Sequence, residues 1–264
     1  MIHLVTLSGN SKRFTDKGLP IKPLCKINDR TIMQTFIESF GDFHDYETFF
    51  VCRNQDLETT SLASEILEHC ENTVNICGID TNSRGPVYSI GQMYDKLPKD
   101  EDILISYIDT IQRATIEDMC DAFVGRDAGL TVHHFKNPHW RNNKSYCLVE
   151  HSGGNVTEVT EKFDFSEFDF SAENDTSAGS SGNYYFNSVE VMNAYFQYLS
   201  SAQVPLIRGE YYVTQAVQEM VRDQLDVVCK HFPYVSLGTP EDVADYEQWK
   251  NWFYHFDYYS HSTI

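Results

Sequence analysis

Positively charged residues are scarce in this sequence. Its 264 residues include 20 Lys and Arg against 39 Asp and Glu, a net charge of −19 at pH 7. Nucleic acid and anionic membranes require a broad cationic surface, so this composition argues against non-specific binding to either. Cysteine pairs of the C-x-x-C type are also absent, and the 7 cysteines are scattered along the chain. We therefore expect a cytoplasmic protein with reduced thiols, and neither a disulfide framework nor a zinc site.

Long apolar runs are missing as well. No run approaches the roughly 20 residues that are needed to cross a bilayer. The short apolar stretch at the N-terminus continues directly into polar SGNSKR, so we do not expect a signal peptide. Aromatic residues, in contrast, are abundant, with 17 Phe, 16 Tyr and 3 Trp. A chain of this length and composition can bury a sizeable core, and we expect one domain without a long linker.

The first half of the chain alternates between β-rich runs and segments with helical periodicity. The β-rich runs predict strands at 3–7, 48–52, 73–77, 102–107 and 130–135. The periodic segments predict helices at 31–40, 55–70, 86–97 and 116–123. This alternation is typical of an α/β fold, a Rossmann-like, mostly parallel twisted sheet with helices on both faces.

The second half has a different pattern. YCLVEHSGGNVTEVTEK (146–162) predicts an antiparallel hairpin about a Ser-Gly-Gly-Asn turn. Further strands are predicted at 183–186 and around 226–237, and helices near 188–200 and 211–222. Pro240 suits the first position of a helix, with Thr239 as its N-cap.

Cations are concentrated behind the first strand, in SGNSKRFTDKGLPIKPL. Residues 1–30 contain six Lys and Arg and two Asp, a balance of +4, which leaves −23 for the other 234 residues. Ligands of open parallel sheets bind beyond the carboxyl ends of the strands. There Gly9 allows close backbone approach, while Arg13 and Lys22 offer donors to phosphate oxygens. Taken alone, this stretch is equally compatible with a solvated basic loop.

Seven motifs in order resemble the nucleotidyltransferases that make nucleotide sugars. The stretch L-S-G-N-S-K-R-F…L-P-I-K-P-L is similar to their signature L-[AN]-G-G-x-G-x-R-[FL]…P-K-P-L. The other six are Gly85-Pro-Val, Ile105-Ser-Tyr-Ile-Asp109, Glu161-Lys162, Gly179-Ser-Ser-Gly182-Asn-Tyr-Tyr-Phe, Glu210-Tyr-Tyr-Val-Thr and Leu237-Gly-Thr-Pro-Glu-Asp. The resemblance implies one nucleotidyltransferase domain with a GT-A-like fold and an antiparallel excursion. It divides into a nucleotide-binding half (1–135), an acceptor-binding half (136–240) and an aromatic C-terminal helix or tail (241–264).

The resemblance also implies roles for individual residues. Nucleotide binding falls to Leu7, Ser8, Gly9, Asn10, Arg13, Gly85 and Pro86. Substrate binding falls to Glu161, Lys162, Gly182 and Glu210, with the glutamate of the Glu161-Lys162 pair on the sugar and the lysine on its phosphate. The implied catalytic residues are Arg13, Lys22, Asp109 and Lys162, with Mg²⁺ as cofactor on Asp109.

The implied reaction joins a nucleoside triphosphate to a small phosphorylated acceptor, such as a sugar 1-phosphate, and releases pyrophosphate. Its setting would be the synthesis of capsule or other surface polysaccharide precursors. The implied partners include neither nucleic acid nor membrane, and a homo-oligomer is compatible with the aromatic stretch WKNWFYHFDYYSHSTI (249–264). Segment 161–179, which interleaves Phe with acidic residues, predicts a lid, an interface or a mobile acidic loop.

Some positions depart from the family pattern. Asn10 and Lys12 stand where the family usually has glycine, and asparagine tolerates a left-handed backbone better than most residues. Ser236 stands where many members carry a second metal-binding aspartate. A catalytically silent relative that binds a nucleotide sugar therefore stays open as an alternative. A GT-A glycosyltransferase is the other alternative, although the strand that ends at Asp109 offers one aspartate where D-x-D would be expected. Ser106 and Tyr107, beside it, are predicted to be packing residues.

Overall fold

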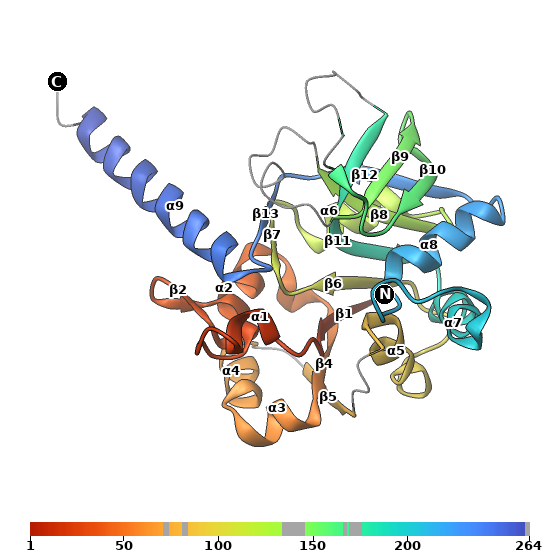
Figure 1. The fold of residues 1–264 in the computed structure, drawn as a ribbon, viewed down its shortest axis with the longest axis horizontal. Helices are drawn as coiled ribbons and strands as arrows, with labels where there is room; N and C mark the ends of the chain where they lie inside the picture. The colour runs from red at the N-terminus through yellow and green to blue at the C-terminus, as the bar shows by residue number, and fades with distance from the viewer. Residues whose placement is uncertain (71–73, 81–83, 134–145, 166–167, 169–175, 262–264) are drawn as a thin grey trace.

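The chain folds around one nine-stranded sheet. The computed structural model describes residues 1–70, 74–80, 84–133, 146–165, 168 and 176–261. Strands follow the order β5-β4-β1-β6-β11-β8-β12-β10-β9, and β10 and β11 run against the other seven (Figure 1). Their bounds are β1 Ile2–Leu7, β4 Glu47–Arg53, β5 Val74–Ile79, β6 Ile103–Tyr107, β8 Ala128–His133, β9 Leu148–Ser152, β10 Asn155–Thr160, β11 Ser177–Phe186 and β12 Val227–His231. The mostly parallel sheet with an antiparallel hairpin is therefore confirmed.

Two small ribbons and a set of helices complete the described part of the fold. The ribbons pair β2 (Lys26–Ile27) with β3 (Arg30–Thr31), and β7 (Thr110–Gln112) with β13 (Tyr234–Ser236). The α-helices are α1 Lys12–Thr15, α2 Ile32–Ser39, α3 Asn54–Thr59, α4 Leu62–His69, α5 Pro86–Gly91, α6 Ile116–Phe123, α7 Val189–Tyr198, α8 Val213–Arg222 and α9 Pro240–His261.

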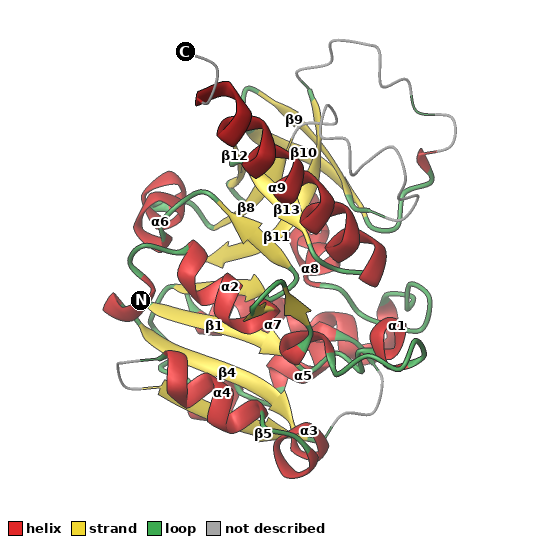
Figure 2. Ribbon diagram, turned by 90° about the vertical axis from the view of Figure 1, so that its left-hand side faces the viewer, coloured by secondary structure: helices red, strands yellow, loops and turns green. Residues whose placement is uncertain are grey.

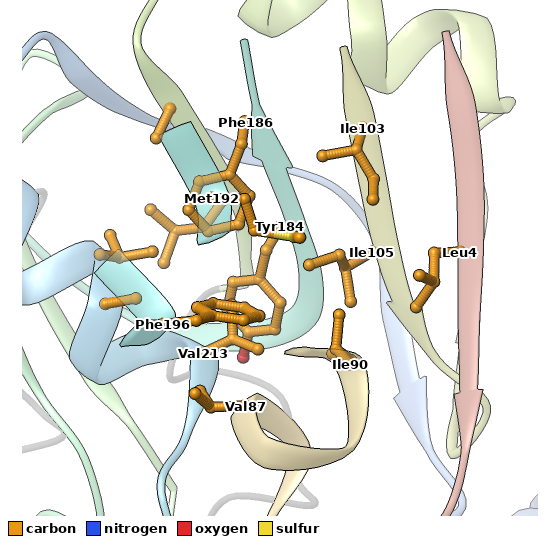
Figure 3. Packing of buried hydrophobic residues seen from close by; sticks show 14 of the residues in the cluster. Leu4, Val87, Ile90, Ile103, Ile105, Tyr184, Phe186, Met192, Phe196 and Val213 are labelled. Carbon is orange, nitrogen blue, oxygen red and sulfur yellow. The ribbon is translucent and has the colours of Figure 1, made fainter. Parts of the chain in front are cut away.

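Helices cover both faces of the sheet. Alternate strand residues point to opposite faces, and both faces carry apolar side chains that the helices bury. Leu4 and Ile105 belong to a core with side chains from α5, α7 and α8, which Figure 3 shows around Tyr184 and Phe186. Val5 and Leu104 belong to a second core with side chains from α2, α4 and α6. Figure 2 shows α2 and α4 lying across β1 and β4. The predicted two-sided packing is thus confirmed.

Three predicted elements divide in the structure. The helix expected over 86–97 gives α5, which ends at Gly91, and a separate 3-10 turn at Tyr94–Lys96. The helix expected over 55–70 is broken at Thr60, whose extended backbone separates α3 from α4. The Thr60 hydroxyl donates to Asp56 O at 2.6 Å and accepts from Leu62 N at 3.2 Å, which stabilises the break. The strand expected over 226–237 divides into β12 and β13 around Pro233, which has no N–H to continue a ladder.

The predicted N-cap of the last helix is present, and α9 projects from the body of the molecule (Figure 1). Asp242 N donates to Thr239 Oγ1 at 3.1 Å, and Thr239 N donates to Asp242 Oδ2 at 2.9 Å. This reciprocal capping satisfies main-chain donors at the start of α9. Among the described helices, none has the length and apolar character to cross a membrane.

His3 is a fully buried titratable group in the second core. Its ring packs edge-on against Phe40 and Phe43, and Nε2 lies 2.9 Å from Ser106 Oγ. Burial lowers the pKa of His3 to about 3, so the folded protein holds this ring neutral. Ser106 is a packing residue here, as the sequence predicts.

We expect His3 to destabilise the protein in acid. The unfolded chain protonates His3 below about pH 6.5, whereas the folded chain does so only near its lowered pKa, so stability falls as pH falls between these values. The contribution amounts to about 2 kcal/mol at pH 5. Urea unfolding of wild type and His3→Gln at pH 7.5 and 5 measures it, and the exposed His231→Gln is the control. Equal pH dependence in wild type and His3→Gln would show that this histidine is not responsible.

Candidate active site

Two cavities adjoin at the carboxyl ends of β1 and β6. The β1 cavity, about 200 Å³, is lined by Thr6, Ser8, Gly9, Asn10, Lys22, Arg84, Gly85, Pro86, Ser89, Tyr107, Ile108, Asp109, Glu210 and Tyr212. The β11 cavity, about 220 Å³, is lined by Arg13, Tyr107, Asp109, Thr110, Tyr146, Cys147, Glu161, Lys162, Ser180, Ser181, Gly182, Tyr184, Tyr212, Tyr234, Ser236, Gly238, Thr239 and Asp242. Three residues, Tyr107, Asp109 and Tyr212, line both cavities. Two ligands could therefore lie side by side and meet at Asp109.

The first loop takes its shape from Ser11. Ser11 has φ 53°, a left-handed backbone, and precedes the short helix α1. This corrects the expectation for Asn10, which instead accepts a hydrogen bond from Lys12 N at 3.1 Å through Oδ1. Ser11 Oγ accepts from Lys22 N at 3.0 Å. That bond ties the loop after β1 to the segment that carries Lys22.

The opposite wall of the β1 cavity depends on Gly85. Gly85 has φ 89°, and a Cβ there would lie 2.7 Å from Tyr211 O, so a larger residue does not fit. Tyr211 N donates to Arg84 O at 2.8 Å, and Val87 N donates to Tyr211 O at 3.3 Å. These bonds hold the start of α5 against the segment before α8.

Asp109 and Lys22 form an ion pair at the junction of the cavities. Lys22 Nζ lies 3.0 Å from Asp109 Oδ2, and the two side chains are 21% and 27% exposed, so water screens the pair only in part. Although burial on its own raises the pKa of the Asp109 carboxyl, Lys22 and, more weakly, Arg13 hold that pKa below its usual value. Asp109 O also accepts from Leu237 N at 2.7 Å, which brings Gly238 to this junction. Asp109 is therefore an ionised carboxylate at neutral pH.

Glu161 and Lys162 follow β10 and reach the β11 cavity together. Lys162 has φ 56°, and its Nζ lies 3.3 Å from Glu161 Oε1. Thr214 Oγ1, at the start of α8, donates to Glu161 Oε2 at 2.5 Å. A left-handed backbone at a non-glycine residue costs energy and often marks a functional position. The structure therefore holds Lys162, beside Glu161, in a backbone conformation that costs energy.

A bulge in β11 gives the cavity its floor. The pairing register of β11 with β8 shifts between Ser180 and Tyr184, and Gly182 in this interval has φ 88°. A Cβ at Gly182 would lie 3.2 Å from Thr110 Cγ2. The bulge turns the main chain toward the cavity beside Asp109.

The structure gathers most of the residues singled out by sequence. The β1 cavity contains Ser8, Gly9, Asn10, Lys22, Gly85 and Pro86, and the β11 cavity contains Arg13, Glu161, Lys162 and Gly182. Glu210 lies in the β1 cavity, apart from the other three residues assigned to substrate binding. The Leu7 side chain is buried in the second core and lines neither cavity.

Among the residues at or beside the cavities that the sequence did not single out for a site, four form part of a wall or orient a residue there. Tyr107, expected only to pack, forms a wall of both cavities, and Tyr212 does the same. Asp242 lines the β11 cavity, and Thr214 orients Glu161. Tyr212 and Thr214 lie inside the Glu210-Tyr-Tyr-Val-Thr motif, and Asp242 ends the Leu237-Gly-Thr-Pro-Glu-Asp motif, so the motifs contained a signal for all three.

Three side-chain oxygen atoms, from Asp109, Ser236 and Asp242, lie near Gly238 and make this position a candidate cation site. A Cβ at Gly238 would lie 3.4 Å from Asp109 Oδ2, 3.6 Å from Ser236 Oγ and 3.7 Å from Asp242 Oδ2. Mg²⁺ prefers oxygen ligands and is commonly held by one or two carboxylates together with substrate phosphates. Two carboxylates near one point could contribute ligands to a divalent cation, although Asp109 Oδ2 accepts from Lys22 Nζ at 3.0 Å in this structure. Asp242 lies close to Ser236, which stands at the position of the expected aspartate.

Fold and cavities together define an α/β protein with two adjoining cavities at the carboxyl ends of its central strands. The family model described as nucleotidyl transferase matches residues 19–249, so the chain belongs to the nucleotidyl transferase family. No curated protein matches the sequence.

Solved structures share the fold at low sequence identity. A nucleoside-diphosphate-sugar pyrophosphorylase from Vibrio cholerae RC9 has 19% identity and TM-score 0.72, covering 94% of this chain and 100% of its own. A UDP-glucose pyrophosphorylase complexed with UDP-glucose has 13% identity and TM-score 0.70, with 96% and 98% covered. The inositol-1-phosphate CTP transferase from T. maritima has 12% identity and TM-score 0.67, with 91% and 90% covered.

Proposed function

We propose that this protein transfers a nucleoside monophosphate from a nucleoside triphosphate to a sugar 1-phosphate or a similar small phosphorylated metabolite, with release of pyrophosphate. The observation that carries the proposal is the pair of adjoining cavities that meet at Asp109. Cationic side chains stand on both sides of that junction, Lys22 in one cavity and Arg13 and Lys162 in the other. Two anionic substrates need this arrangement, because the rest of the chain is strongly acidic.

The nucleotide occupies the β1 cavity in this proposal. Gly9 and Asn10 offer main-chain groups to the phosphates, and Gly85 and Pro86 border the base. The acceptor occupies the β11 cavity, where Glu161 binds a sugar hydroxyl and Lys162 binds the phosphate. In this assignment the nucleotide contacts come mainly from 1–135 and the acceptor contacts from 136–240.

An oxygen of the acceptor phosphate attacks the α-phosphorus of the triphosphate. A new phosphorus–oxygen bond forms while the bond between the α-phosphorus and the oxygen bridging to the β-phosphorus breaks, and pyrophosphate leaves. The attacking group is already an anion at neutral pH, so no general base is required. Catalysis then consists of positioning and charge stabilisation. Lys22 neutralises charge at the α-phosphate, and Lys162 aligns the nucleophile. Arg13 lines the β11 cavity close enough to Asp109 to act on its charge, so it would bind the departing phosphates from that side of the junction.

Asp109 and Asp242 are the carboxylates that would hold Mg²⁺, with nucleotide phosphates completing its ligands. The metal would neutralise charge between the phosphates. Ser236 Oγ lies 3.3 Å from Asp242 Oδ2 and so helps to fix that carboxylate beside the junction.

Asp242→Asn is expected to weaken Mn²⁺ binding about tenfold, since mutation of groups at a metal site commonly costs 10- to 100-fold. Asparagine retains an oxygen that can accept from Thr239 N, so α9 should remain capped. Calorimetric titration of Mn²⁺ in the presence of a triphosphate measures the effect. Glu241→Gln, at the neighbouring exposed carboxylate, is the matched control. Equal affinity in wild type and Asp242→Asn would remove Asp242 from the metal site.

We further propose that the reaction supplies nucleotide sugars for capsule or other surface polysaccharides in the cytoplasm. The L-G-T-P-E-D element at 237–242 supports the first part, since it resembles that of capsule-type members. The seven cysteines are free thiols, in keeping with a reducing compartment.

A thermal-shift panel tests the proposal without knowledge of the acceptor. ATP, GTP, CTP, UTP and dTTP are each added with and without Mg²⁺. A triphosphate at 100 times its Kd should add about 2.7 kcal/mol of stability. Stabilisation by one triphosphate supports the proposal and identifies the base. Stabilisation by nucleotide sugars or diphosphates alone would point instead to a regulatory relative or a glycosyltransferase.

A further inference from the structure

Tyr212 stands between the two cavities and contacts a charged residue in each. It precedes α8, where its N–H donates to Gln215 Oε1 at 2.9 Å. Its side chain is partly buried and lines the β1 cavity and the β11 cavity. The Tyr212 side chain is therefore part of the wall that two ligands would share.

On the side of the β1 cavity, Tyr212 fixes Glu210. The Tyr212 hydroxyl donates to Glu210 Oε2 at 2.7 Å. Burial and, secondarily, this hydrogen bond raise the pKa of Tyr212, so the hydroxyl stays a donor at neutral pH. Glu210 lies against Gly85, as the distance of 2.8 Å between a Cβ built at Gly85 and Glu210 Cβ shows. The position of Glu210 relative to a bound nucleotide thus depends on the hydroxyl.

On the side of the β11 cavity, Tyr212 supports Lys162. Lys162 Nζ lies over the Tyr212 ring, 4.7 Å from its centroid, a geometry typical of a cation–π interaction. The same ammonium lies 3.3 Å from Glu161 Oε1. Ring and carboxylate together hold Lys162 where an acceptor phosphate would bind.

We infer that Tyr212 is a positioning residue with two separable functions. Its hydroxyl places the Glu210 carboxylate to accept a hydrogen bond from the nucleoside part of the triphosphate, and its ring places Lys162 for the acceptor phosphate. The inference rests on the proposed function for the identity of the two ligands. Because one function belongs to an oxygen atom and the other to a ring, two substitutions at this position distinguish them. Tyr212→Phe removes only the hydroxyl, and Tyr212→Leu removes both.

The matched control is Tyr195→Phe. Tyr195 OH donates to Asp223 Oδ2 at 2.8 Å, a bond of the same kind, and neither residue lines the β1 cavity or the β11 cavity. A general effect of losing a tyrosine–carboxylate bond would appear equally in this variant.

The experiment measures Kd by calorimetry for the stabilising triphosphate and for a sugar 1-phosphate separately, and KM for both by pyrophosphate release. Loss of a hydrogen bond to a charged group predicts that Tyr212→Phe weakens triphosphate binding about tenfold. Its acceptor affinity should stay within about twofold, since the cation–π contact remains. Tyr212→Leu should weaken both, the acceptor about fivefold by loss of that contact. Tyr195→Phe should change neither.

Equal effects of Tyr212→Phe on both ligands, or no effect of either variant, would overturn the inference. The proposed function fails in a different way. In that case wild type binds both ligands without pyrophosphate release, while the selective effects at Tyr212 persist in the Kd values. Failure of wild type to bind either ligand would overturn both proposals.

Discussion

Asp109→Asn is expected to reduce kcat for pyrophosphate release by about 10²–10³, the usual cost of removing one charge-stabilising group from an active site. Asp109 lines both cavities and holds Lys22 through a 3.0 Å ion pair. Asparagine has nearly the same shape, so the side chain still fits, while the anionic ligand for a divalent cation is lost. Steady-state kinetics with saturating triphosphate and acceptor measure the change.

The matched control for this substitution is Asp226→Asn. Asp226 also pairs with a cation, Arg126 at 2.8 Å, but about half of its side chain is exposed and it lines neither cavity. We expect its variant to keep wild-type kcat. A rate close to wild type in Asp109→Asn, with the protein still folded, would contradict the central role given to this carboxylate.

Lys22→Ala is expected to lower kcat/KM by a similar factor of about 10²–10³. Alanine removes the cation beside Asp109 and leaves a largely buried carboxylate without its main partner. The remaining Arg13 acts on Asp109 more weakly. The matched control is Lys17→Ala, at a half-exposed lysine that pairs with Glu241 outside both cavities.

The pH dependence of Lys22→Ala provides a second readout of the same prediction. In wild type the pKa of Asp109 is lowered, so the carboxylate stays ionised until the pH falls below the usual carboxyl range. The stability that depends on this charge is lost over the same pH range. Without Lys22, the Asp109 carboxyl loses the main group that lowers its pKa, so this pKa should be higher than in wild type. The acid limb of kcat/KM should therefore move to higher pH in Lys22→Ala. An unchanged acid limb and an unchanged rate would show that the ion pair has no role in turnover.

The order of strands and loops along the sequence predicts that Gly9 and Asp109 lie near each other. Gly9 and Asp109 each follow a β-rich run, and parallel strands place such positions at one edge of the sheet. β1 and β6 are neighbours in the sheet, which brings the loop with Lys22 to Asp109. Sequence patterns suffice where the geometry follows from strand direction.

Other features depend on contacts that sequence patterns do not specify. The left-handed conformation expected at Asn10 is found at Ser11 instead. The Ser11 hydroxyl accepts from Lys22 N, 11 residues away, a contact that no local pattern specifies. Asp242 lies in the first turn of α9 and accepts from Thr239 N, yet the bond between Asp109 O and Leu237 N brings it to the junction. The assignment of Glu210 to a cavity requires knowledge of how the segment before α8 lies against Gly85.

The divided elements show the same limit at the level of secondary structure. The apolar periodicity over 55–70 predicts one helix, but hydrogen bonds of the Thr60 hydroxyl favour a break. The greater part of the segment after Phe165, for which a lid, an interface or a mobile loop was expected, lies outside the described residues. Its described start packs Phe163 and Phe165 edge-on beside the Glu161-Lys162 pair.

The most direct test of the proposed reaction is ³¹P NMR of the protein with the stabilising triphosphate, Mg²⁺ and a panel of sugar 1-phosphates. The proposed reaction replaces one acceptor signal by the two coupled signals of a diphosphate bridge and releases one equivalent of pyrophosphate. Wild type should produce this change, and Asp109→Asn should produce it about 10²–10³ times more slowly. Release of orthophosphate alone, or transfer of sugar from an added nucleotide sugar without pyrophosphate chemistry, would contradict the account.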